Sequence, residues 1–493
     1  MSIAIEAQIQ RRAAGAAALL PLALLLAAFA LLQPTSARNP DVTWLLTVCE
    51  HVLDGQRLYV DIIETNPPAS VWLYLPAVLL ARLLHLAPET LVDLQFLALA
   101  CGGLVLAARI LDRGGLLRGH DRTLLGCSAL AVLVLMPRDT FGERDHALTL
   151  LALPILACLG LRAGRLSPGI GQMLASGALA GVALCVKPQF ALALLLASAA
   201  SMALARSWRV LLAPELWLAG MLAAAYGAAA LALAPEFFAD VLPAILLTYL
   251  PVRLPLGTLL MTPGFVAFAL ALLLDRQTAG GRLPPAPATI LIAAAVGAML
   301  AYLVQGKGWA YQTLPMVQLA ALPLAIALAA PGASRAGIAA RLAVLLGFGL
   351  FYLGDAPDYP ALRAEMLRLP PHSSVMAISS DLSVGHPLVR QIGGVWAGRL
   401  GSLWAVSGAI IRRAGGNMDA AQAAQVAAAA RAHVLMLAQD IAGHRPDVVL
   451  VDRADYDWAG LIDGYPELAA ALAGYADGGA FDKTQILRRK TVP

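Results

Sequence analysis

Charged side chains are scarce in this sequence: Asp, Glu, Lys and Arg make up only 13% of its 493 residues. A soluble domain carries roughly 25%, so the chain has too little polar surface to cover itself in water. The formal net charge is only +4, and the arginines lie in short loops rather than in one patch. This distribution gives little support to nucleic-acid binding.

Paired cysteines are also missing. The five cysteines are scattered, mostly inside apolar runs, and are Cys49, Cys101, Cys127, Cys158 and Cys185. No CxxC pair and no Cys/His cluster occurs in the sequence. Neither a zinc site nor a disulfide framework is therefore expected.

Long apolar runs are abundant instead. Hydrophobic residues make up 59% of the sequence, and the mean hydropathy is +0.73. A helix that crosses a bilayer needs about 20 mostly apolar residues. The runs that approach this length are 13–33, 68–86, 91–111, 123–137, 147–163, 170–186, 189–205, 210–234, 256–275, 287–304, 311–330 and 337–354. We therefore expect an α-helical polytopic membrane protein.

Basic residues predict which loops face the cytoplasm. The first run follows Arg11 and Arg12 and has no clear cleavage site, so we expect a retained first span with a cytoplasmic N-terminus. The predicted cytoplasmic loops contain Arg113, Arg118, Arg122, Arg162, Arg165, Arg206, Arg209, Arg276, Arg282, Arg335 and Arg341. The outer face then receives 34–67, 138–146, 187–189, 235–255, 305–310 and the chain after about 355. We interpret the chain as a multi-pass protein of the bacterial inner (plasma) membrane.

One apolar run is expected not to span. Three runs lie between the outer loop ending near Pro67 and the outer loop starting at Arg138, whereas an even number is required. The run 68–86 is the exception we favour, because Arg82 and His85 shorten it and prolines interrupt it. An interfacial or re-entrant helix there leaves eleven spans. Such a helix is tolerated only where protein or a water-filled cavity shelters it, so we expect a cavity at the outer leaflet.

The composition changes after the last apolar run, where charges, turns and shorter apolar segments appear. Strand-like segments at Val375–Ser379 and Asp447–Asp452 flank an Ala-rich helical stretch at 418–439. This alternation predicts a small periplasmic α/β domain at 355–493, after a transmembrane domain at 1–354. The candidate functional side chains of that domain are Asp381, His386 and Trp396.

The first outer loop is rich in carboxylates. Asp41 lies just outside the first span, and Asp61 and Glu64 follow in the same loop. A carboxylate in such a position can act as a general base toward an acceptor hydroxyl. On residue type alone a helix cap is the simpler interpretation of Asp41, since Asn-Pro-Asp before an apolar stretch is a typical N-terminal signal.

The second outer loop concentrates ionisable residues at 138–146, directly before the next span. Arg144 lies among Glu143, Asp145 and His146. Carboxylates and a histidine beside an arginine suit a phosphate or metal-phosphate site. The alternative is ordinary interfacial anchoring.

Further cations fall in the remaining outer loops. Lys187 lies in a three-residue loop between two apolar runs, and Lys307 is flanked by glycines, which allow a close approach to a ligand. A lysine at the end of a span can instead snorkel to the interface, and Tyr311 near Lys307 can be an aromatic-belt residue. Arg253, in a Pro-flanked loop, is a weaker candidate.

These residues together form a cationic set on one predicted face, opposed to an acid. The set is Arg144, Lys187, Lys307 and Arg253, and the acid is Asp41. Cations at an outer-leaflet cavity stabilise a phosphate leaving group, and a nearby carboxylate supplies the base. This is the minimum needed for transfer from a lipid phosphate.

The same motifs, in this order, resemble those of the GT-C superfamily of polyprenyl-phosphate-sugar glycosyltransferases. The resemblance is to the bacterial branch related to protein O-mannosyltransferases and lipid A aminoarabinose transferases, and it covers roughly the first two-thirds of the chain. The matching elements are Asp41, Asn66-Pro67-Pro68, Gly142–His146, Lys187-Pro188 and Gln305–Trp309. The better-known branches have Asp-Glu where this chain has Asp41-Val42, and Lys-Pro-Pro where it has Asn66-Pro67-Pro68.

The resemblance implies an inverting transfer of a monosaccharide from a polyprenyl-phosphate carrier to an envelope acceptor. By resemblance Asp41 is the base, with Asp61 and Glu64 as rival acids. The implied phosphate- and donor-binding residues are Arg144, Lys187, Lys307, Arg253, Gln305 and Tyr311. Some relatives use a divalent metal such as Mg or Mn, for which the candidate ligands are Glu143, Asp145 and His146.

Two other functions fit a polytopic protein. A transporter or flippase would have charges spread through its span centres and repeated halves, whereas the charges here gather at one predicted face. A non-catalytic scaffold for envelope assembly would use the C-terminal domain for docking. That function leaves Lys187, Lys307 and the 138–146 cluster without a role.

Overall fold

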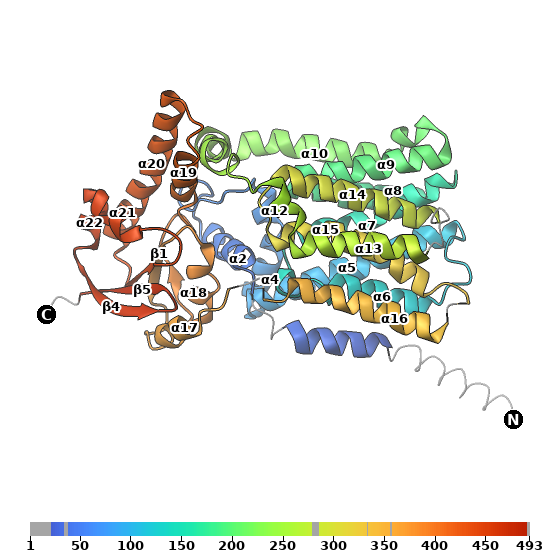
Figure 1. The fold of residues 1–493 in the computed structure, drawn as a ribbon, viewed down its shortest axis with the longest axis horizontal. Coiled ribbons are helices and arrows are strands. Elements are labelled where there is room, and N and C mark those ends of the chain that lie inside the picture. The colour runs from blue at the N-terminus through green and yellow to red at the C-terminus, as the bar shows by residue number, and fades with distance from the viewer. Residues whose placement is uncertain (1–20, 34–37, 279–284, 333, 355–356, 491–493) are drawn as a thin grey trace, which may run out of the picture. The chain divides into compact units, whose positions relative to one another are not determined.

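The structure of the protein is a computed structural model that describes residues 21–33, 38–278, 285–332, 334–354 and 357–490. The chain forms two compact units (Figure 1). Unit 1 contains 1–37, 93–226 and 254–355, and unit 2 contains 38–92, 227–253 and 356–493. The start of the first predicted span, with Arg11 and Arg12, and also Arg282 lie outside the described residues.

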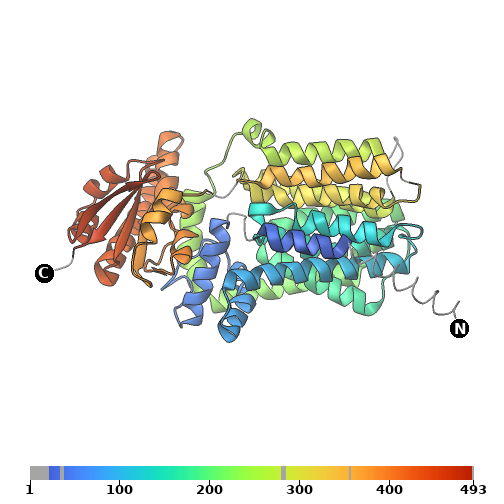
Figure 2. The same cartoon turned by 90° about the horizontal axis from the view of Figure 1, so that it is seen from below.

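Unit 1 is a bundle of apolar helices that run side by side (Figures 1 and 2). An N-terminal helix covers Pro21–Leu32. The bundle continues with α5 (Pro88–Arg113, which begins in unit 2), α6 (Arg122–Val134), η2 (Arg138–Thr140), α7 (Arg144–Ala163), α8 (Ile170–Val186), η3 (Pro188–Phe190), α9 (Ala191–Ala205), η4 (Trp208–Leu212), α10 (Pro214–Leu233, which ends in unit 2), α12 (Leu256–Leu260), α13 (Pro263–Thr278), α14 (Ala286–Gln305), α15 (Ala310–Leu328), α16 (Arg335–Gly347) and η7 (Phe348–Tyr352).

Seven helices among the described residues are long and apolar enough to cross a membrane. They are α5, α7, η3 with α9, α10, α14, α15 and α16 with η7. The protein is therefore a multi-pass membrane protein. The other four of the eleven predicted spans contain helices that are shorter in the described residues, at Pro21–Leu32, α6, α8 and α13.

Two helices form the centre of unit 1. In the apolar windows of α7 and α15, 94% and 89% of the residues are buried. A helix that is apolar on all sides belongs inside a bundle, and α14 packs against both of these helices and against α9. Gly297 permits the last contact, because a Cβ at this position would lie 2.5 Å from the Cα of Ala193.

Unit 2 begins with three helices that come from the first predicted outer loop and the run after it. They are α2 (Pro40–Leu53), α3 (Ala69–Trp72) and α4 (Leu75–Leu84). The predicted non-spanning run 68–86 is therefore two short helices with a break at Leu73–Tyr74. At 1.5 Å per residue, the ten residues of α4 cover about 15 Å, half of a bilayer core of about 30 Å.

The segment 235–255, predicted as an outer loop, is largely helical. It contains η5 (Phe237–Val241), α11 (Leu242–Ala244) and η6 (Ile245–Tyr249), of which η5 and η6 are π-helical. The prediction of a loop was wrong because the apolar residues of this segment pack into the core of unit 2, where Phe237 and Ile245 are buried. Arg412 of α19 (Trp404–Ala414) donates to the carbonyl of Leu247 over 2.5 Å.

The C-terminal part of unit 2 is the predicted α/β domain. Its five-stranded sheet has the order β2-β1-β3-β5-β4. The strands are β1 (Ser374–Ile378), β2 (Val395–Trp396), β3 (Val448–Asp452), β4 (Tyr475–Phe481) and β5 (Thr484–Arg489), and the helices besides α19 are α17 (Pro360–Met366), η8 (Leu382–Val384), α18 (Leu388–Gln391), α20 (Ala420–His444), α21 (Trp458–Gly464) and α22 (Pro466–Leu472). β1 pairs in parallel with β2 and β3, whereas β5 pairs antiparallel with β3 and β4. The predicted strands and Ala-rich helix correspond to β1, β3 and α20, so the expected fold class is confirmed.

The predicted division into 1–354 and 355–493 coincides with only one of the points at which the chain passes between units. Unit 2 also takes in 38–92 and 227–253. The first outer loop therefore belongs, by its contacts, with the C-terminal strands and helices. The domain assignment itself stays a prediction.

Candidate active site

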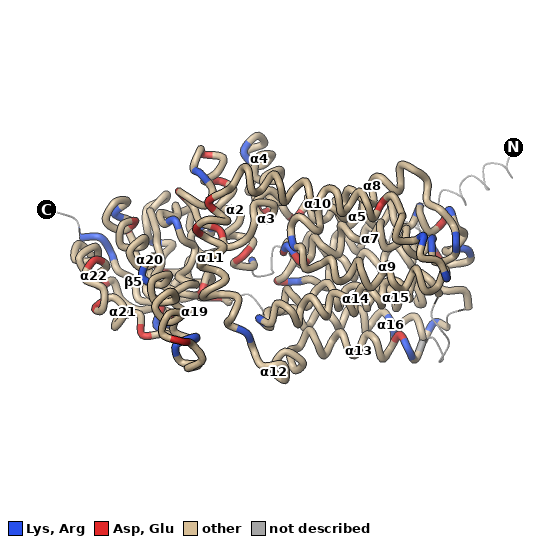
Figure 3. The backbone as a smooth tube through the Cα atoms, turned by 90° about the horizontal axis from the view of Figure 1, so that it is seen from above, with Lys and Arg blue, Asp and Glu red and all other residues tan. Residues whose placement is uncertain are grey.

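The predicted outer loops of unit 1 meet at one end of its bundle. Asp139 accepts a hydrogen bond of 2.7 Å from the backbone N–H of Gly354, and Leu254 donates to the carbonyl of Gly306 over 2.8 Å. In Figure 3 the charged residues of unit 1 lie mostly at the ends of the helices, with uncharged stretches between them. This arrangement agrees with the predicted grouping of the loops, although the membrane face at which each end lies stays a prediction.

A buried ion pair lies at this end of unit 1. The ammonium of Lys187 pairs with the carboxylate of Asp145, and the two residues are only 5% and 2% exposed. Asp145 belongs to the first turn of α7, and Lys187 follows α8 directly. Lys187 also lies 5.3 Å from the ring centre of Tyr311 at the start of α15. The sequence-predicted residues Asp145, Lys187 and Tyr311 are thus brought together, and Lys187 does not snorkel to the interface.

Arg144 lies beside this pair, in the first turn of α7, and is 4% exposed. Glu143 is the N-cap of the helix, and its carboxylate accepts from the backbone N–H of Arg144 over 3.3 Å. The local pattern of a carboxylate before a helix is the usual N-terminal signal. It fixes the start of α7 and thereby places Arg144 and Asp145.

His146 does not behave as a metal ligand. Its Nδ1 accepts from the N–H of Gly142 over 3.3 Å, and its Nε2 lies 2.7 Å from the carbonyl oxygen of Leu133. Both ring nitrogens are therefore bonded to backbone, and Asp145 is bonded to Lys187. No group of three His, Cys, Asp or Glu side chains suited to a metal is found in the described part of the chain. The metal set Glu143, Asp145 and His146 therefore has no support in their geometry.

The second lysine lies in the turn between α14 and α15. Lys307 is half-buried, and the glycines on either side of it have φ values of +67° and +77°. These values lie in the left-handed region that glycine adopts without strain, so both glycines shape this turn. Gln305 is half-buried and donates to the carbonyl of Ala301 in its own helix over 3.3 Å. Arg253 belongs to unit 2, where its side chain is exposed.

Asp41 lies in the first turn of α2 in unit 2 and is half-buried. The cap of this helix is Asn39, whose side-chain oxygen accepts from the backbone N–H of Asp41 over 2.8 Å. The alternative in which Asp41 itself caps the helix is therefore wrong. A carboxylate in a first turn is still stabilised by the helix dipole.

The two rival acids have different surroundings. The Asp61 side chain is 40% exposed, and hydrogen bonds from the Arg57 side chain and backbone lower its pKa. Glu64 is 2% exposed. Its carboxylate accepts from four donors, which are Trp44 Nε1 at 2.6 Å, Thr65 Oγ1 at 3.2 Å, Asn66 N at 2.9 Å and Asn66 Nδ2 at 2.5 Å. These bonds hold the Glu64 carboxylate in a fixed position between α2 and the segment at Thr65 and Asn66.

The candidates of the C-terminal domain have mainly structural contacts. Asp381 caps the short helix η8 by accepting from the N–H of Ser383 over 2.8 Å. His386 and Trp396 are 0% and 2% exposed, and their ring centres lie 4.7 Å apart. Burial, followed by the charge of Arg390, lowers the pKa of His386 to about 3. His386 is therefore neutral near pH 7.

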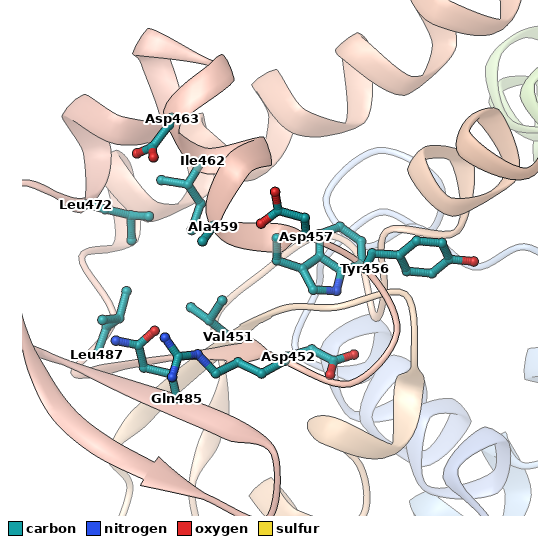
Figure 4. Close-up of a pocket in the computed structure, with 12 residues that line it drawn as sticks. Val451, Asp452, Tyr456, Asp457, Ala459, Ile462, Asp463, Leu472, Gln485 and Leu487 are labelled. Atoms are coloured by element: carbon teal, nitrogen blue, oxygen red, sulfur yellow. The ribbon is translucent and has the colours of Figure 1, made fainter. Parts of the chain in front are cut away.

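A cavity of about 450 Å³ lies elsewhere in unit 2. Figure 4 shows Ala459 and Ile462 of α21 on one side and Gln485 and Leu487 of β5 on the other. The remaining lining residues are Val451, Asp452, Arg453, Tyr456, Asp457, Trp458, Asp463 and Leu472. None of the functional-site residues predicted from the sequence lines this cavity.

The sequence analysis missed a three-residue ion-pair cluster in unit 2. Arg390 of α18 binds the carboxylate of Glu50 in α2 and that of Glu89 at the start of α5. Arg390 follows both glutamates by more than 300 positions along the chain. No local pattern could have indicated the cluster, because the residues around Arg390 in the sequence do not show which carboxylates it pairs with.

Comparison with known structures identifies the fold. No protein-family model matches the sequence, and no curated protein matches it. The structure is similar to that of ArnT from Cupriavidus metallidurans bound to undecaprenyl phosphate, with a TM-score of 0.58 and 15% identity over 95% of this chain and 97% of that chain. The apo form of the same protein gives a TM-score of 0.56 and 14% identity, over 96% and 98% of the two chains. This chain has the ArnT fold. The membrane-helix fold with a small C-terminal α/β part, expected from the sequence, is confirmed.

Proposed function

We propose that the chain is a membrane glycosyltransferase that moves a monosaccharide from a polyprenyl-phosphate carrier to a hydroxyl of an envelope acceptor. The observation that carries the proposal is the buried pairing of Lys187 with Asp145 next to Tyr311. A charged pair inside a protein is costly to desolvate, and such groups at membrane depth are usually functional. Support also comes from the fold, which is shared with an ArnT structure that contains undecaprenyl phosphate.

The donor phosphate binds to the cations at the polar end of unit 1. As the bond between the sugar and the phosphate breaks, negative charge develops on the phosphate oxygens. Lys187 and Arg144, both buried, stabilise this charge more strongly than they would in water. Lys307, in its glycine-flanked turn, and Arg253 are further donor-binding residues of the proposal, as are Gln305 and Tyr311.

Asp41 is the general base. It takes the proton of the acceptor hydroxyl, whose oxygen then attacks the anomeric carbon while the lipid phosphate leaves. A single displacement of this kind inverts the configuration at that carbon. The reaction takes place at the periplasmic face of the bacterial inner membrane, where the C-terminal domain also lies.

The test uses purified protein in nanodiscs with a panel of polyprenyl-phosphate sugars, and it measures the release of free polyprenyl phosphate. We expect Asp41→Asn to lower release by at least about 10²-fold, the usual contribution of a general base, while donor binding persists. Asp61→Asn is the matched control, because it removes a carboxylate of the same loop whose side chain is 40% exposed, and it should retain release.

Three results would contradict parts of the proposal. Equal release from wild type and Asp41→Asn would remove the base role from Asp41. Loss of release in Asp61→Asn alone would transfer that role to Asp61. Wild-type protein that neither binds nor turns over any donor would favour the scaffold or transporter functions.

A further inference from the structure

The helix that contains Asp41 is held by a segment more than 300 residues later in the chain. Residues 386–396 of the C-terminal domain contact α2 at Trp44, Thr47 and Glu50. All of these residues belong to unit 2. Successive members of this series are three residues apart, a spacing at which side chains are neighbours on a helix surface.

The first contact is an ion-pair cluster near the C-terminal end of α2. Arg390 donates to both carboxylate oxygens of Glu50, over 2.6 and 3.1 Å, and to Glu89 over 2.6 Å. The side chains of Arg390, Glu50 and Glu89 are 12%, 31% and 23% exposed. Burial alone would lower the pKa of Arg390, but the bond to Glu50 and the charges of both carboxylates raise it above its ordinary value. A two-bond pairing fixes direction as well as distance.

The second contact is aromatic and lies near the N-terminal end of α2. The ring of Trp44 has its centre 5.1 Å from that of His386 and 6.2 Å from that of Trp396. Its indole N–H donates to Glu64 over 2.6 Å. Trp44 is 5% exposed and stands three residues after Asp41, on the same face of the helix.

The two contacts together determine the position of α2. Asp41 and Glu50 are nine residues apart, which corresponds to about 14 Å along the helix axis. With Trp44 held near one end and Glu50 near the other, α2 can neither slide along its axis nor turn about it without breaking a contact. A reacting group displaced by about 1 Å can lose about 10²-fold in rate.

We propose that segment 386–396 positions the base for the reaction, with Arg390 as its principal positioning residue. This inference rests on the proposed function, in which Asp41 is the base. It gives the C-terminal domain a role within the catalytic step itself. Arg390 acts through α2 and touches neither donor nor acceptor.

The experiment compares Arg390→Met, Arg390→Lys and the control Arg399→Met in full-length protein in nanodiscs. Arg399 is a matched control, because it pairs with the buried Asp440 over 2.7 Å in the same domain and makes no contact with α2 among the hydrogen bonds of the described residues. Three quantities are measured: kcat for polyprenyl phosphate release, donor Kd, and amide hydrogen exchange of residues 40–53.

We expect Arg390→Met to lower kcat by about 10²-fold, with donor Kd within about twofold of wild type and faster exchange in 40–53. Arg390→Lys should recover part of kcat, since lysine keeps the charge but not the two-bond geometry. Arg399→Met should keep kcat and the wild-type exchange of α2. If kcat of Arg390→Lys is no higher than kcat of Arg390→Met, the two-bond geometry of Arg390 is not what positions the base.

Other outcomes would overturn the inference. Wild-type kcat in Arg390→Met, or an equal loss in Arg399→Met, would show that Arg390 does not position the base. A weakened donor Kd in Arg390→Met would make the residue part of donor binding instead. If wild type turns over no donor, the proposed function fails and the catalytic role of Arg390 with it. Faster exchange of 40–53 in Arg390→Met alone would then establish a purely structural clamp.

Discussion

Replacing Lys187 by methionine is expected to lower both stability and activity, and a second substitution should restore the stability alone. Lys187 and Asp145 are each at most 5% exposed, so the substitution leaves a buried carboxylate without its cation. Removing one partner of such a pair costs about 3–5 kcal/mol. Methionine itself fits an apolar bundle, so little of this loss comes from packing. The free energy of unfolding should therefore fall by about 3–5 kcal/mol in Lys187→Met.

The double variant Lys187→Met with Asp145→Asn tests this reasoning. It removes both charges, and replacing a whole buried pair by uncharged groups is often nearly neutral. The double variant should therefore be more stable than either single variant. Release of polyprenyl phosphate should be absent in Lys187→Met and also in the double variant, because both lack the proposed phosphate-binding cation.

Denaturant-induced unfolding in detergent micelles measures the stabilities, and the release assay measures the activity. Arg57→Gln is the control, because it breaks an ion pair at the surface, where Arg57 and Asp61 have side chains 70% and 40% exposed; little change is expected. A double variant whose loss equals the sum of the two single losses would refute the coupling of the pair. A double variant that regains release would refute the role of Lys187 in binding phosphate.

Two further predictions concern unit 2. The pKa of His386 is lowered to about 3 by burial and then by the Arg390 charge, against about 6.5 when unfolded. A histidine with a depressed folded pKa contributes stability above pH 6.5 that is lost as pH falls toward 3. At about 1.4 kcal/mol per pH unit, wild type should lose about 2 kcal/mol more than His386→Phe between pH 7 and pH 5 in thermal unfolding, and equal losses would argue against a neutral buried His386. Ala459→Trp fills the cavity beside α21, which is lined by none of the proposed donor-binding residues. It should therefore leave polyprenyl phosphate release within about twofold of wild type, as should the surface control Ala470→Trp, whereas a selective loss in Ala459→Trp would mean that this cavity takes part in turnover.

Much of the fold follows from local pattern. An apolar run of the right length can only be satisfied as a helix in a membrane, and each run expected to span contains one in the described residues. The charge and prolines of 68–86 predicted a segment that does not span, and two short helices are found there. The strands β1 and β3 were predicted to within one residue because short runs of valine and isoleucine between turns are typical of buried strands.

Other features depend on contacts that no local pattern carries. The segment 235–255 was predicted as an outer loop because it lies between two apolar runs. The structure makes it helical, since Phe237 and Ile245 find partners in the core of unit 2. The start of α2 was predicted, but the cap favoured from residue type was Asp41, and the structure has Asn39. Both residue types are good caps, and only the hydrogen bond between the two residues decides.

Lys187 illustrates the same limit at the site. A lysine at the end of a span is equally compatible with snorkelling and with phosphate binding. What distinguishes the two interpretations is the position of Asp145, 42 residues earlier in the chain, because helix packing brings its carboxylate to Lys187. Stability alone does not favour such a pair, because well-packed apolar residues are often as stable or more so. A carboxylate partner does offset part of the cost of burying a cation before an anionic ligand arrives. In the proposed reaction the donor phosphate takes over as the partner of Lys187, so the pair holds the lysine ready for each new donor.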